Sequence, residues 1–136
     1  MISPTFDSLR IFLHLMAVAV WVGGQIVLAG LVPNVRRAAP EALTPIARGF
    51  ARVAWPAMGL IVFTGAWGLA SQNVAERSSE YMATFGLKML VVAVAVIATI
   101  VHSQGRSTAA KAIGGALGLL GSLAAAWCGI LLAHVG

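Results

Sequence analysis

Four long apolar stretches, separated by short polar segments, make up most of the chain. They run over about residues 9–32, 44–70, 84–102 and 112–135. A hydrocarbon core about 30 Å thick requires about 20 apolar residues per helix, and each stretch is long enough. The pattern therefore predicts four transmembrane helices and an integral membrane protein.

Prolines and short polar residues predict where these helices begin, bend and end. Pro33 and Asn34 are expected to end the first helix. Thr44 is expected to cap the second helix, with Pro45 at its first position. Pro56 falls inside the second helix, where a missing backbone donor predicts a bend.

The connections between the stretches are short, at about residues 33–43, 71–83 and 103–111. Short connections make neighbouring helices antiparallel. We therefore expect an all-α, up-down four-helix membrane bundle that forms a single transmembrane domain over residues 1–136. The first stretch is too long for the apolar part of a secretory signal, so it is expected to be a retained helix.

Composition and charge agree with this fold class, since 60% of the 136 residues are hydrophobic and only 10% are charged. A soluble domain carries charge at about a quarter of its positions. Six basic residues lie in or near the first and third connections, against three at the other ends of the helices. This asymmetry predicts that the first and third connections are cytoplasmic and that both termini lie on the outer side. The predicted location is the inner (cytoplasmic) membrane, which the chain crosses several times. The formal net charge of +5 then favours anionic lipid of the bilayer as the partner, and nothing indicates nucleic-acid binding.

Two histidines are the strongest candidates for chemistry, because polar groups in a membrane helix are costly unless they serve a site. His14 and His134 are expected at the same level near the outer face. Each has a tryptophan seven residues deeper, Trp21 and Trp127, on the same helix face. The two pairs are expected to face each other across helices one and four, with glycines such as Gly114 permitting close approach.

This arrangement suggests a site in which neutral imidazoles ligate a metal between aromatic walls. The alternative is that the tryptophans anchor the helices at the interface and the histidines bond to neighbouring helices. Two histidines at one level suit haem b, whose iron takes two axial ligands. Copper is the alternative cofactor if Met82 or Met89 closes over the histidines.

Other polar residues of the helices have two readings each. Lys88 either extends its ammonium to the interface or pairs with a haem propionate. His102 is either an interfacial residue or a metal ligand shared with a partner chain. Thr64 and Thr99 are expected to donate to the backbone of their own helices. The sequence carries no phosphate-binding glycine loop, nucleophile elbow or paired membrane carboxylates, which argues against these enzyme classes.

Three segments resemble the CopD copper-resistance superfamily and the related HemJ-type membrane proteins: LHLMAVAVWVGG, ARGFARVAWPAMGLIVFTGAWGL and FGLKMLVVAVAVIATIVH. The resemblance implies copper uptake or haem-linked redox chemistry, with His14 as the lead ligand and Lys88 and His102 in support. This chain has four predicted helices where CopD-like proteins often have more, and it lacks the aromatic and basic run of the HemJ type after Gly24.

Three hypotheses follow. The first is a small haem b protein for electron transfer, the second is a copper-binding or copper-uptake protein, and the third is a structural subunit without a cofactor. The third is motivated by the glycine-rich fourth helix, which would pack in a larger membrane complex or a homo-oligomer.

Overall fold

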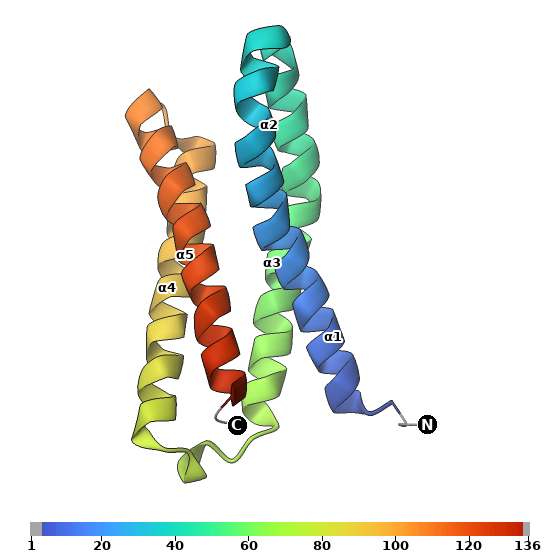
Figure 1. The fold of residues 1–136 in the computed structure, drawn as a ribbon, viewed down its shortest axis with the longest axis vertical. Coiled ribbons are helices and arrows are strands. Elements are labelled where there is room, and N and C mark those ends of the chain that lie inside the picture. Colours follow the sequence, from blue (N-terminus) through green and yellow to red (C-terminus); the bar gives the residue numbers. More distant parts are fainter. Residues whose placement is uncertain (1–3, 135–136) are drawn as a thin grey trace. The chain divides into compact units, whose positions relative to one another are not determined.

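A computed structural model describes residues 4–134, which form helices joined by short turns, with no β-strand among them (Figure 1). The elements are α1 (Phe6–Val18), the π-helical η1 (Ala19–Gly23), α2 (Gly24–Ala38), the 3-10 turn η2 (Pro40–Ala42), α3 (Leu43–Ala70), the 3-10 turn η3 (Val74–Glu76), α4 (Ser79–Gln104) and α5 (Thr108–His134). Because α1, η1 and α2 follow without a break, four long helical segments result, each apolar enough to cross a membrane. The all-helical fold is thus confirmed, and its four long apolar helices are compatible with a multi-pass membrane bundle, whereas the side on which the termini lie stays a prediction.

The predicted end of the first helix at Pro33 is wrong. The helix runs through Pro33 to Ala38, and the Arg37 side chain donates from Nε to the Pro33 carbonyl at 3.3 Å. In a membrane the helix is the conformation that satisfies the backbone internally, so an isolated proline is tolerated there. The helix ends instead at Ala38, and the next residue, Ala39, has left the helical conformation (φ −154°, ψ 69°) directly before Pro40.

The second helix begins one residue before the predicted start. Its N-cap position is Ala42, so Thr44 is not the capping residue. Pro45 lies in the first turn, where backbone donors have no partner within the helix in any case. Pro56 lies inside α3 as predicted. The predicted end of the last helix at Val135 falls outside the described residues.

The chain divides into two compact units, Met1–Val74 and Ala75–Gly136. In the first unit α1 packs against α3, and in the second α4 packs against α5. Each unit is therefore a helical hairpin with its own packing (Figure 1).

Glycines of α5 permit the close approach of α4 in the second unit. A Cβ at Gly114 would lie 2.7 Å from the Ala98 carbonyl oxygen and 2.7 Å from the His102 nitrogen. A Cβ at Gly118 would lie 2.8 Å from Thr99 Oγ1. The G-x-x-x-G spacing is thus used for backbone-to-backbone packing within one chain.

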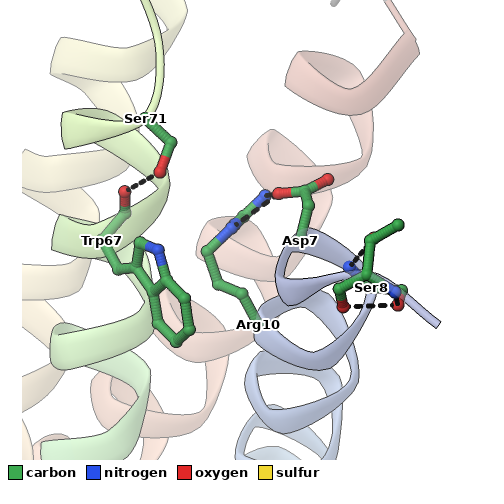
Figure 2. Close-up of polar contacts among 6 residues, drawn as sticks. Asp7, Ser8, Arg10, Trp67 and Ser71 are labelled. Atoms are coloured by element: carbon green, nitrogen blue, oxygen red, sulfur yellow. Dashed lines mark hydrogen bonds and ion pairs between the residues drawn. The ribbon is translucent and has the colours of Figure 1, made fainter.

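The first unit uses larger and more polar contacts. Trp21 of η1 is only 3% exposed, and Thr64 of α3 is fully buried. Near the N-terminus of α1, the Arg10 side chain extends toward α3 and donates to Asp7 Oδ1 from Nε at 3.0 Å and Nη2 at 2.6 Å (Figure 2). Gly68 leaves room for it, because a Cβ there would lie 2.6 Å from Arg10 Nη1. Arg10 therefore lies close to α3 at Gly68, one turn from His14 on α1.

Candidate functional site

His14 lies on α1 one turn beyond Arg10, half-buried against α3. Its Nδ1 lies 2.7 Å from Thr64 Oγ1. This hydrogen bond joins α1 to α3, between residues that are fifty positions apart in sequence. Thr64 is 0% exposed and is the largest fully buried side chain among the described residues. The histidine is therefore held at one of its two ring nitrogens by the best-buried group of the unit.

The direction of this hydrogen bond follows from the proton count at Thr64. The threonine hydroxyl carries a single proton. Its Oγ1 donates to the Leu60 carbonyl at 2.6 Å, with the Ile61 carbonyl at 3.2 Å, as predicted for a threonine in a membrane helix. Oγ1 therefore accepts from His14, so Nδ1 carries a proton and, in the neutral imidazole, Nε2 carries the lone pair.

Trp21 lies two turns further along the helix, in the π-helical segment that the sequence did not predict. Its ring meets that of Trp55 edge to face, with centroids 5.6 Å apart and planes at 65°. Gln25 Nε2 donates to the Trp21 carbonyl at 3.1 Å. π-helical segments are rare in proteins overall, and those that occur often lie at functional sites. Trp55 directly precedes Pro56, so the π-helical segment of the first helix meets α3 next to its internal proline.

Polar and aromatic residues of α1 and α3 lie at the end of the first unit near His14. Figure 2 shows Trp67 and Ser71 of α3 on one side and Asp7 and Arg10 of α1 on the other. Ser71 Oγ donates to the Trp67 carbonyl at 2.8 Å, and the Arg10 side chain is 16% exposed. His14 thus lies one turn inside a charged and aromatic boundary, the position expected for a group just within the hydrocarbon.

The second predicted pair has different surroundings within its own unit. Trp127 is 60% exposed and His134 is exposed, whereas Cys128 and Leu132 are buried on α5. The His134–Trp127 face of α5 is therefore available to contacts outside its hairpin. Since His14 and His134 belong to different units, their pairing stays a prediction.

Lys88 is half-buried on α4 beside a glycine of α5. A Cβ at Gly129 would lie 3.3 Å from Lys88 Nζ, so the absence of a side chain there leaves space for the ammonium. The pairing of Lys88 with a haem propionate is a prediction that this placement leaves open.

His102 lies at the end of α4 and joins the α4–α5 turn. Its Nδ1 is 2.5 Å from the Lys111 carbonyl oxygen, so Nδ1 carries the proton and donates. A Cβ at Gly115 would lie 2.9 Å from the same nitrogen. This contact gives His102 a structural role in the turn, and its role as a metal ligand stays a prediction.

Metal-binding side chains do not form a cluster in the part of the chain that the structure describes. Within the described residues, no group of three or more His, Cys, Asp or Glu side chains is placed to hold a metal ion. Met82 is 39% and Met89 is 50% exposed. Haem requires only two protein ligands, so it makes no demand for such a group.

Replacing Thr64 by valine is expected to destabilise the first unit by about 1 kcal/mol, since hydrogen bonds between membrane helices are of that size. Valine has nearly the same shape but leaves the His14 Nδ1 proton without its acceptor. Thermal unfolding in detergent measures the change, and Thr64→Ser, which keeps the hydroxyl, is the matched control. Equal stability of Thr64→Val and the unchanged protein would show that the bond contributes nothing.

Comparison with known proteins finds no match for this chain. The sequence matches no protein-family model, and neither a curated protein nor a solved structure matches it. The resemblance to CopD-like proteins therefore stays a prediction, and the geometry around His14 is the firmest basis for a function.

Proposed function

We propose that this protein binds haem b in the membrane, with His14 as an axial ligand of the iron, and that it serves electron transfer. The observation that carries the proposal is the hydrogen bond from His14 Nδ1 to the buried Thr64 hydroxyl. Metal-ligating histidines almost always donate their second ring nitrogen to a fixed acceptor, which sets the tautomer and the ring orientation. His14 has this arrangement. His102 has it too, through the Lys111 carbonyl, but only the acceptor of His14 is a fully buried side chain.

The residues around His14 suit a flat, largely apolar group. Trp55, which packs against the buried Trp21, is 39% exposed and provides aromatic surface. Arg10, one turn from His14 toward the helix end, is a cation at the level where haem carboxylates would reach the interface. Lys88 is the second cation that we assign to a propionate.

His134 is our candidate for the second axial ligand. It lies on the exposed face of α5, so its side chain is available outside its own hairpin. If His14 and His134 held a haem, the group would supply one-electron redox chemistry. Electron transfer is therefore the activity that this ligand set supports best.

The cofactor content of the protein tests the proposal. The full chain, produced in cells supplied with a haem precursor and purified in mild detergent, is expected to carry one haem b per chain by the pyridine haemochrome assay. Copper and zinc are measured on the same sample. Copper without haem would overturn the proposal in favour of copper handling, and a protein without haem or metal would overturn it in favour of a structural subunit.

A further inference from the structure

An apolar groove lies along the second hairpin, between α4 and α5. It has a volume of about 230 Å³. Its lining consists entirely of apolar residues from α4 and α5: Val94, Ile97, Ala98, Val101, Ile113, Gly114 and Leu117. On α4 the lining runs from Val94 to Val101, a rise of about 10 Å or two turns of helix. Gly114 contributes no side chain and lies close to the α4 backbone.

One end of this groove carries positive charge. Lys111 precedes Ile113 by two residues on α5, and Arg106 lies in the turn that leads into α5. Both side chains are exposed. The chain contains no acidic residue after Glu80, which lies at the opposite end of α4. Both cations therefore lie in the segment that connects the lining residues Val101 and Ile113, and this segment contains no acid.

The backbone adds to this charge. α5 begins at Thr108, so Lys111 belongs to its first turn, where the partial positive charge of the helix is located. His102 donates from Nδ1 to the Lys111 carbonyl and so fixes the turn that carries the cation. The position of Lys111 relative to the groove is thus set by a hydrogen bond between the two helices.

We propose that the groove holds an acyl chain of an anionic phospholipid whose phosphate is bound by Lys111 and Arg106. The charge pattern decides the occupant, since a zwitterionic lipid would gain little from two cations and a helix N-terminus. Basic pockets between membrane helices bind anionic headgroups in the same way. The site lies in one hairpin and does not depend on haem.

Lipid titration followed by native mass spectrometry tests the proposal on the full chain in detergent. Phosphatidylglycerol is the anionic probe and phosphatidylcholine is the zwitterionic one. We expect one tightly retained phosphatidylglycerol per chain and weaker retention of phosphatidylcholine. Retention of both lipids to the same extent would overturn the proposal, as would a second copy of the chain that excludes lipid from the groove.

Variants separate the headgroup from the acyl chain. Lys111→Gln with Arg106→Gln is expected to weaken phosphatidylglycerol binding about 25-fold, or about fivefold per cation, and to leave phosphatidylcholine unchanged. Val101→Phe, at a half-open position of the groove, is expected to weaken both lipids. Arg77→Gln, at the opposite end of the hairpin, is the matched charge control. Unchanged phosphatidylglycerol binding in the double variant, with unchanged thermal unfolding, would contradict the assignment.

Discussion

Replacing His14 by alanine is expected to lower the haem affinity at least about 100-fold, so that the purified protein loses its Soret absorbance. Removal of groups that only orient a metal ligand typically costs 10- to 100-fold, and loss of the ligand itself costs more. Thr64 remains buried in this variant and keeps its own bond to the Leu60 carbonyl. The fold is therefore expected to survive, which thermal unfolding in detergent checks.

Two further variants make this result specific. His14→Gly leaves space for free imidazole, and added imidazole is expected to restore the Soret band if the ring of His14 is the ligand. His102→Gln removes a histidine that bonds to the α4–α5 turn and is expected to retain full haem content. Full haem content in His14→Ala would exclude this residue as a ligand.

Replacing Gly114 by leucine is expected to separate α4 from α5 and to destabilise the second hairpin by about 3 kcal/mol. The atoms that a Cβ at this position would meet are the Ala98 carbonyl oxygen and the His102 backbone nitrogen, both at 2.7 Å. Backbone atoms of a packed helix cannot move aside as a flexible side chain can, so the helices must part. Thermal unfolding followed by circular dichroism measures the effect.

Gly86→Leu is the matched control for this substitution. Gly86 lies on α4 in the same hairpin, and a Cβ there would meet nothing within 4 Å. The same change of residue type should therefore leave stability nearly unchanged at that position. Equal unfolding temperatures for Gly114→Leu and Gly86→Leu would contradict the packing described for α4 and α5.

The four long apolar helices could be predicted because length and apolar content can be read directly from each stretch of the sequence. Length and apolar content were sufficient for four spanning helices, and the glycine spacing indicated where backbones approach. The helix ends were less predictable, since Pro33 is tolerated inside a membrane helix whereas Pro40 ends it. Proline alone does not distinguish these cases, because the outcome depends on how the neighbouring backbone groups are satisfied.

The site could be predicted only in part. His14 and Trp21 were singled out by their position and spacing, but their partners Thr64 and Trp55 lie on α3. Such pairs depend on the register between two helices, which no local pattern reveals. The π-helical turn at Ala19–Gly23 also has no signature in a uniformly apolar stretch.

The central proposal is that an imidazole nitrogen of His14 binds haem iron, and pulsed electron paramagnetic resonance tests this most directly. The ferric protein would be prepared with all histidines labelled with ¹⁵N. We predict a low-spin signal coupled to histidine nitrogen that is lost or halved in His14→Ala. A haem signal without histidine coupling, or one that is identical in the variant, would contradict the account.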